Sequence, residues 1–459
     1  MHEILELRQE NSKTFDLGAG KRQLESHIGA THYKDEYASD EPWKDIDLTW
    51  EGNKITKAPY ELTLDGKKLT IRDKKSGEVS VIELTEIGGK PIKSLPDIAW
   101  EKSKGLARAP GITTLENVAL DTDLEIVTEN SAVRFTRVLK SDKAPTEAKF
   151  RVTDKIPFRV NASDEDGKLP VETTLIDGIL TETLKPNRPV KYPVRIDPTW
   201  QVGASTDDCN RRLSDNVWGI GAGADAQAGA YDATYYQYGS GMRFTAITIL
   251  HMSTITQAYL TLRASASVAS TVTKSRISAE DVDDAVTFAD DKAAFDTRWA
   301  ARTTARVDWD AIPAWTVNVD YNSPEIKTVI QEIIDRASWA SGNDIVIFWE
   351  DFEDRSTHAE VNRKTAYCYD DSTTYCPKLV IVYTVPTISG TVTLTGSGVA
   401  DAVIRCVNQT TGDVYTGASI AGGGYSVDIP VAGSYHTVVE YETGGVKYNA
   451  KSLWDVVIS

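Results

Sequence analysis

Apolar and polar residues alternate with a period of two along much of this chain, and short turn signals interrupt the pattern. Residues 60–64 alternate in this way, Asp65-Gly66 follows, and the alternation resumes over 68–71. Asp-Gly between two alternating runs is a strong hairpin signal, because both turn residues must tolerate a positive φ. The same arrangement recurs around Asp177-Gly178. The pattern therefore predicts a mainly β chain built from antiparallel hairpins.

Length and charge divide the chain into three segments. At roughly 100–200 residues per domain, 459 residues correspond to about three domains. Residues 200–385 carry −10 of the formal net charge of −17, whereas 386–459 are rich in Gly, Val and Thr. We therefore predict three consecutive β domains over 1–199, 200–385 and 386–459. Turn signals every 8–12 residues in the last segment are typical of a small immunoglobulin-like or transthyretin-like sandwich.

One helix is expected in the middle segment. Ser323-Pro324-Glu325 is a favourable start, because Ser caps helices, Pro fits the first turn and Glu complements the helix dipole. Apolar residues then recur with helical spacing at Ile326, Val329, Ile330, Ile333 and Ile334. We expect this helix to cross the end of a β sandwich. Residues 88–118 have little pattern and are expected to be mostly loop.

Composition and motifs argue against several classes of protein. A pI near 4.9 makes nucleic acid and anionic membrane surfaces unlikely partners, since both require a basic face. No run approaches 18 apolar residues, and the N-terminus lacks a secretory leader, so we expect synthesis in a cytoplasm without membrane insertion. The signatures H-E-x-x-H, C-x-x-C and G-x-S-x-G are absent. Gly18-Ala-Gly20 is interpreted as a turn between two strands.

Acidic clusters are the first candidate sites. Asp281, Asp283 and Asp284 form a possible Ca²⁺ site, because hard cations bind several oxygens from irregular loops. Further groups lie at 350–354 and at Asp370-Asp371. Solvated loops explain the same residues without a metal, and no other cofactor is expected. Two of these carboxylates would also suit the acid and nucleophile of a glycosidase.

Aromatic residues and cysteines supply the remaining candidates. A partly exposed stripe of aromatic rings would stack on sugars, although packing in the core explains large aromatics equally well. The stripe would consist of Trp218, Tyr235, Tyr236 and Tyr238. Cys368 and Cys376 flank a predicted hairpin and are a candidate disulfide, which would be reduced in a cytoplasm and able to close outside a cell.

The middle segment resembles the DNRLRE family of jelly-roll modules, which are grouped with carbohydrate-binding modules. The matching stretches are Gly241-Met-Arg-Phe244, Ile255–Leu262, Ser323-Pro-Glu-Ile326, Val329–Ile333 and Trp339–Asn343. The resemblance implies a jelly-roll sandwich with one helix. It transfers no catalytic residue, and the family's opening aspartate-rich strand is matched only loosely, at 205–210.

The flanking segments resemble modules found beside such jelly rolls in large surface and virion proteins. In the first segment the matches are His32-Tyr-Lys-Asp35, Trp43–Asp47 and Tyr192–Pro198. The last segment is similar to carboxypeptidase-regulatory-like and other Ig-like modules through Ile388–Val392, Gly424-Tyr-Ser and Gly433-Ser-Tyr435. Strings of β modules of this kind are similar to fibres and decorations of tailed phages.

The resemblance implies a non-enzymatic structural or adhesive virion protein. It would dock on an assembly of other virion subunits, form a homo-oligomer and contact host-surface glycan. The first alternative is a secreted bacterial carbohydrate-binding protein, extracellular or on the cell surface. The second alternative is a polysaccharide-degrading enzyme with the jelly roll as an accessory domain. These functions rest on analogy between families.

Overall fold

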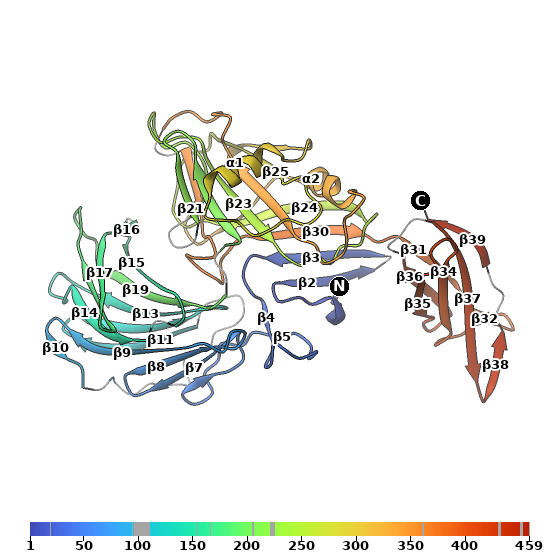
Figure 1. Ribbon diagram of the computed structural model, residues 1–459, viewed down its shortest axis with the longest axis horizontal. Helices are drawn as coiled ribbons and strands as arrows, with labels where there is room; N and C mark the ends of the chain where they lie inside the picture. The colour runs from blue at the N-terminus through green and yellow to red at the C-terminus, as the bar shows by residue number, and fades with distance from the viewer. Residues whose placement is uncertain are drawn as a thin grey trace.

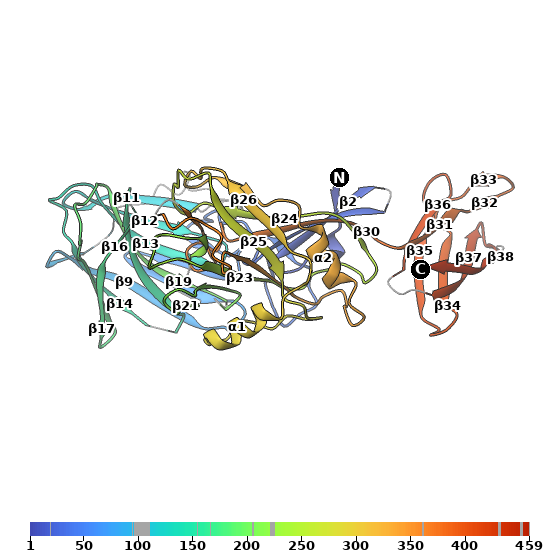
Figure 2. The same cartoon turned by 90° about the horizontal axis from the view of Figure 1, so that it is seen from above.

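The computed structural model describes residues 1–18, 20–93, 95, 111–153, 155–165, 167–203, 206–220, 225–359, 362–429, 433–449 and 453–458. It confirms a mainly β chain whose strands form antiparallel sheets. In Figure 1 two β sandwiches lie side by side, and a smaller β unit at the C-terminus extends beyond them. Figure 2, seen from above, shows the same unit at one end of the long axis.

The first sandwich packs two sheets from the N-terminal half of the chain. One sheet contains β6 (Lys54–Ile55), β7 (Tyr60–Asp65), β8 (Lys68–Asp73), β9 (Val79–Ile87), β10 (Lys90–Pro91), β14 (Glu147–Val152), β17 (Val171–Ile176) and β18 (Ile179–Leu184). The other contains β11 (Gly111–Ala119), β12 (Thr122–Thr128), β13 (Ala132–Leu139), β15 (Phe158–Asp164), β16 (Gly167–Leu169) and β19 (Val194–Gln201). Their facing apolar residues, including Leu62, Phe135 and Trp200, form one core.

The second sandwich is formed mostly by the middle segment. Its larger sheet contains β20 (Asp208–Arg212), β21 (Val217–Ile220), β22 (Ala226–Gly229), β23 (Tyr238–Phe244), β25 (Thr273–Ala279), β26 (Val307–Ile312), β28 (Ile345–Glu350) and β29 (Arg363–Ala366). Its smaller sheet has the order β1 (His2–Glu3), β2 (Ser12–Gly18), β3 (Lys21–His27), β30 (Lys378–Thr384), β24 (Thr254–Arg263) and β27 (Asp320–Asn322). Leu260, Trp349 and Ile381 are among the buried residues between them.

The N-terminal hairpin belongs to this second sandwich. Strand β3 pairs with β30 over seven residues, from Lys21 with Thr384 to His27 with Lys378, and Leu24 is fully buried in the second core. The predicted first domain, 1–199, places these strands with the first sandwich, so the pairing differs from the predicted division. The difference arises because β30 pairs with β24 along one edge and with β3 of the N-terminal hairpin along the other. Such long-range pairing leaves no local sequence signal.

Helix α2 (Lys327–Ile334) confirms the predicted helix, and its buried face consists of Val329, Ile330, Ile333 and Ile334. Ser323 does not cap it; the cap position is Ile326, which has no side-chain cap. The Ser323 hydroxyl instead accepts a 3.0 Å hydrogen bond from the Leu260 amide.

A second helix corrects the expectation of a single one. Helix α1 (Lys292–Ala300) begins after Asp291, whose carboxylate accepts hydrogen bonds from the amides of Ala293 and Ala294. It covers the outer face of the larger sheet with Phe295, which packs against Phe348 and Phe352. Among the described residues these two α helices are the only ones, and neither is long and apolar enough to cross a bilayer.

The C-terminal unit is a small β unit with its own core, which includes Ile404, Val427 and Tyr435. Its strands are β31 (Thr387–Thr391), β32 (Thr393–Leu394), β33 (Ser397–Gly398), β34 (Val403–Asn408), β35 (Val414–Ala418), β36 (Gly424–Asp428), β37 (Gly433–Thr443), β38 (Val446–Asn449) and β39 (Leu453–Ile458). Elsewhere, β4 (His32–Tyr33) pairs with β5 (Lys44–Asp45), and η1 (Leu5–Leu7) is a short 3-10 turn.

Both predicted hairpins are present, and β7 turns into β8 at Gly66 and Lys67, because Asp65 ends β7 and pairs with Lys68. Asp177 and Gly178 have φ values of 52° and 73° and join β17 to β18. Gly18 ends β2 and pairs with Lys21 at the start of β3, as expected for a connection between two strands. The expectation of loop over 88–118 is corrected where the structure describes it, because β10 and most of β11 fall in this range. The rest of that expectation, at 94 and 96–110, lies outside the described residues.

Candidate functional site

A loop from Tyr367 to Pro377, between β29 and β30, joins the two sandwiches. The backbone amides of Asn130 and Ser131, in the turn between β12 and β13, donate to the hydroxyls of Thr374 and Thr373 at 3.2 and 3.0 Å. The Asn130 side chain donates to the Ala30 carbonyl at 2.8 Å. These hydrogen bonds satisfy polar groups of the loop and of the turn, and they hold the two segments in register.

Glu129 is the centre of this contact. Its carboxylate is 2% exposed and accepts hydrogen bonds from the Thr373 amide at 2.7 Å and the Ser372 hydroxyl at 3.1 Å. Arg134 pairs with the second carboxylate oxygen at 2.5 Å. Charge-assisted hydrogen bonds in a buried setting are stronger than neutral ones. The first and second sandwiches therefore share an interface that is held by buried hydrogen bonds and an ion pair.

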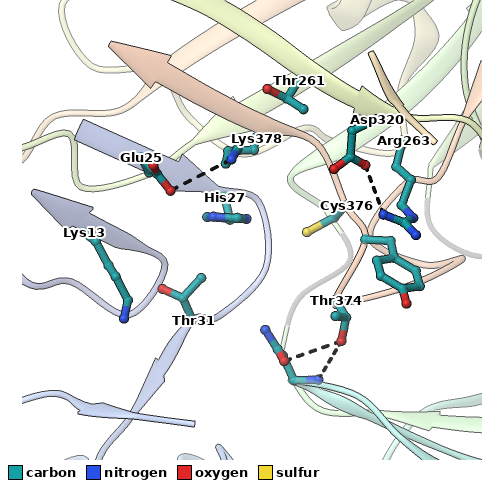
Figure 3. Close-up of a pocket in the computed structure, with 12 residues that line it drawn as sticks. Lys13, Glu25, His27, Thr31, Thr261, Arg263, Asp320, Thr374, Cys376 and Lys378 are labelled. Carbon is teal, nitrogen blue, oxygen red and sulfur yellow. Dashed lines mark hydrogen bonds and ion pairs between the residues drawn. The ribbon is translucent and has the colours of Figure 1, made fainter. Parts of the chain in front are cut away.

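A polar hollow of about 230 Å³ opens beside this loop and is the candidate binding site (Figure 3). Its walls come from β2, β3, β24, β30 and both sides of the junction. In the figure, Lys13 and Thr31 lie on one side of the hollow and Arg263 and Asp320 on the other. The lining residues are Lys13, Glu25, His27, Thr31, Asn130, Thr261, Arg263, Asp320, Thr374, Tyr375, Cys376 and Lys378.

Charges in the hollow are paired between neighbouring strands of one sheet. Lys378 lies 3.9 Å from Glu25, and Arg263 bonds to Asp320 at 3.2 Å. The Arg263 guanidinium also lies over the Tyr375 ring, 4.1 Å from its centroid. Burial raises the pKa of the Cys376 thiol to about 12, so this group stays protonated. Donors and acceptors thus stand side by side in one hollow, which is the arrangement that a hydroxyl-rich ligand needs.

Three of the predicted glycan-binding aromatics cluster near the start of β23. The Arg212 guanidinium lies 4.6 Å from the Tyr235 ring centroid and 5.2 Å from that of Tyr238. Tyr236 stacks on His358 at 4.2 Å. Tyr235 is 40% exposed, whereas Tyr238 is buried and accepts a 2.8 Å hydrogen bond from Arg212. The exposed ring in this group is therefore Tyr235.

Trp218 does not join this group. It pairs in register with Arg211, while Tyr238 pairs with Arg212, so the two aromatics project from opposite faces of the larger sheet. Its ring packs on Phe295 of α1 at 5.2 Å, and its indole N–H donates to Asp290 at 3.0 Å. The structure thus divides the predicted stripe between two faces, and glycan binding by these residues stays a prediction.

The three predicted calcium ligands have protein partners. Arg336 bonds to Asp283 at 2.8 Å and also pairs with Asp281. Asp284 accepts a 2.9 Å hydrogen bond from the Asp344 amide. The Arg336 guanidinium therefore lies where a calcium ion was expected. Its positive charge balances the carboxylates of Asp281 and Asp283. The sequence pattern shows acidic spacing but not the arginine, which comes from after α2.

The candidate disulfide is corrected: Cys368 and Cys376 are free, buried thiols. Cys376 accepts a hydrogen bond from the Gly29 amide at 3.2 Å and lies 3.6 Å from the Thr373 carbonyl. Cys368 lies 3.5 Å from the Asp371 carboxylate. The segment between them is the junction loop rather than a hairpin, so the two sulfurs face different partners.

Sequence analysis did not bring together one group of residues that can bind a metal ion. Asp208, Cys368 and Asp370 each offer a ligand atom, and these atoms lie within 4.8 Å of one another. Asp370 was noted only as half of an acidic pair, and 160 residues separate Asp208 from Cys368. The hollow was missed for the same reason, because its lining comes from six separate stretches of chain.

Comparisons with protein families and with curated proteins found no match. No family model matches the chain, and no curated protein matches it. The likeness to DNRLRE-type modules therefore stays an expectation from the sequence motifs.

Proposed function

We propose that this chain is a structural or adhesive component of a virus particle that presents the junction hollow to glycan. The observation that carries the proposal is the hollow itself, which combines paired charges, threonine hydroxyls and an aromatic ring at a fixed interface. Sugar hydroxyls both donate and accept hydrogen bonds, and such mixed linings suit them. Because the lining lies mostly on strands of one sheet and on the junction loop, which is hydrogen-bonded to the turn at Asn130, the hollow is organised before a ligand arrives, which lowers the entropic cost of binding.

The extended arrangement supports display on a particle. The two joined sandwiches form a broad base, and the C-terminal unit extends away from them (Figure 1). Several copies on one particle would convert weak single contacts into firm attachment. A secreted bacterial glycan-binding protein is the second candidate, and the same hollow favours it. The two candidates differ in assembly, since virion components form closed oligomers or polymers.

Glycan-array binding of the full chain tests the site. Arg263→Ala removes the guanidinium over Tyr375 and should lower binding at least tenfold. Arg405→Ala is the matched control, because Arg405 forms a comparable exposed ion pair with Glu440 in the C-terminal unit. Tyr235→Ala tests the aromatic cluster instead. Loss with Tyr235→Ala and retention with Arg263→Ala would place the binding site in the turn before β23 and contradict the hollow.

Solution mass by light scattering tests the assembly. A stable trimer, hexamer or open polymer supports the virion proposal. A strict monomer at tens of micromolar contradicts it and favours the secreted glycan-binding protein.

A further inference from the structure

A buried cluster behind the junction loop combines two carboxyls and a thiol. Asp208 lies on β20, and Cys368 and Asp370 lie in the loop before β30. All three are buried, with 1%, 0% and 2% of their surfaces exposed. An oxygen of each carboxyl and the Cys368 sulfur lie within 4.8 Å of one another. This separation allows one ion to contact all three after small side-chain movements.

Unpartnered oxygens provide an independent sign of a missing ligand. Asp208 Oδ1 and Asp370 Oδ2 are buried and accept no hydrogen bond. The second oxygen of each carboxyl is held: Tyr369 donates its amide to Asp208 Oδ2 at 2.6 Å, and Gln201 donates to Asp370 Oδ1 at 3.1 Å. Each carboxyl is therefore oriented while one of its oxygens stays free. A buried oxygen without a partner is costly unless a proton or a cation satisfies it.

The local charges point to a cation. Four carboxyls gather here, those of Asp208, Asp225, Asp370 and Asp371. Two cationic side chains reach them: Arg159 lies 3.7 Å from Asp370, and Lys168 lies 3.2 Å from Asp225 and 3.5 Å from Asp371. Carboxyls therefore outnumber the cationic side chains that pair with them, which favours a bound cation.

We propose that Asp208, Cys368 and Asp370 bind one Zn²⁺ ion that fastens the junction loop to β20. A thiolate ligand selects zinc over calcium or magnesium, which prefer oxygen-only sites. A tetrahedral zinc ion takes one further ligand, which a water molecule would supply. Binding releases the thiol proton of Cys368 and any proton on the two carboxyls, so zinc affinity rises with pH. Because its ligands are buried on β20 and in the junction loop, the ion would act by holding these two elements together rather than by contacting a ligand in the hollow.

Metal titration of the full chain, stripped with chelator, tests the proposal. We expect one Zn²⁺ per chain by competition with a chromophoric chelator, and a higher melting temperature when zinc is bound. Co²⁺ in the same site should give the intense near-ultraviolet absorption of a thiolate-to-cobalt transition. Cys368→Ser should abolish this absorption, and Asp208→Asn should lower zinc affinity at least a hundredfold.

Cys376→Ser is the matched control, because this second buried thiol of the same loop is not a ligand and the variant should keep both signals. Circular dichroism of each variant shows whether the fold is retained. Asp208→Asn should also raise the melting temperature of the metal-free chain, since it removes an unpartnered buried acid, while it abolishes the shift with zinc. No zinc binding by the wild-type chain, or binding that survives Cys368→Ser and Asp208→Asn together, would overturn the proposal. Calcium binding without a cobalt–thiolate signal would also overturn it.

Discussion

The two junctions of this molecule are built in different ways. Between the sandwiches, Glu129 is 2% exposed and accepts hydrogen bonds from the junction loop, and the N-terminal hairpin completes a sheet of the second sandwich. The C-terminal unit follows β30 directly, through Val385 and Pro386. Arg22 pairs with Asp428 across this connection, and Asp428 is 36% exposed. Buried polar contacts and shared strands couple units strongly, whereas exposed ion pairs contribute little.

This difference indicates which parts of the molecule form one rigid unit. The two sandwiches are joined by groups that lose partners if they separate, so they should move and unfold together. The C-terminal unit has its own apolar core and should unfold separately. A rigid base with an independently folded outer unit suits a protein that docks and displays.

The largest effect is expected from the strand that crosses between segments. Leu24→Ala should destabilise the joined sandwiches by about 2–5 kcal/mol, since it leaves a cavity in the second core. Hydrogen exchange should rise more in β30 than in β13. Leu175→Ala is the control, because Leu175 is 42% exposed on β17. Faster exchange confined to β12 and β13 would place the N-terminal hairpin with the first sandwich instead.

The second largest effect is expected from breaking the polar junction between the sandwiches. Glu129→Ala leaves the Thr373 amide and Arg134 without their buried acceptor and should cost about 2–3 kcal/mol in urea unfolding. Glu61→Ala is the matched control, because Glu61 forms an exposed pair with Arg72 in the same sandwich. It should cost under about 1 kcal/mol. Equal effects of the two variants would contradict a strongly coupled first junction.

The pH dependence of stability should differ between the joined sandwiches and the C-terminal unit, because Glu350 is buried in the second sandwich. Burial raises its pKa from 4.5 to about 7. The folded state therefore keeps a proton that the unfolded state loses, so this group's effect lowers stability as the pH rises from 4.5 through 7. Glu350→Gln should remove this loss, with a relative gain of about 3 kcal/mol at high pH. Calorimetry should show the change in the transition of the joined sandwiches and none in that of the C-terminal unit.

The smallest effect is expected at the second junction. Arg22→Ala should change the stability of either transition by less than about 1 kcal/mol, because its pair with Asp428 is partly exposed. Small-angle scattering should show a wider spread of positions for the C-terminal unit in this variant. A loss as large as that of Glu129→Ala would mean that both junctions are equally rigid.

Local signals predicted much of this fold. Asp177-Gly178 and the apolar face of α2 act within a few residues, and both are where the sequence placed them. Helix α1 was missed because one buried residue, Phe295, gives no apolar period, although Asp291 is a good cap. The junction could not be predicted, because Glu129 and Thr373 meet across 244 residues. Charge spacing alone likewise could not show that Arg336 pairs with Asp281 and Asp283.

Scanning calorimetry of the full chain tests whether the first two sandwiches form one cooperative unit. We predict two transitions. Because unfolding enthalpy scales with length, the transition of residues 1–385 should have roughly five times the enthalpy of the transition of 386–459. Three separate transitions, with the first and second sandwiches melting apart, would contradict the account.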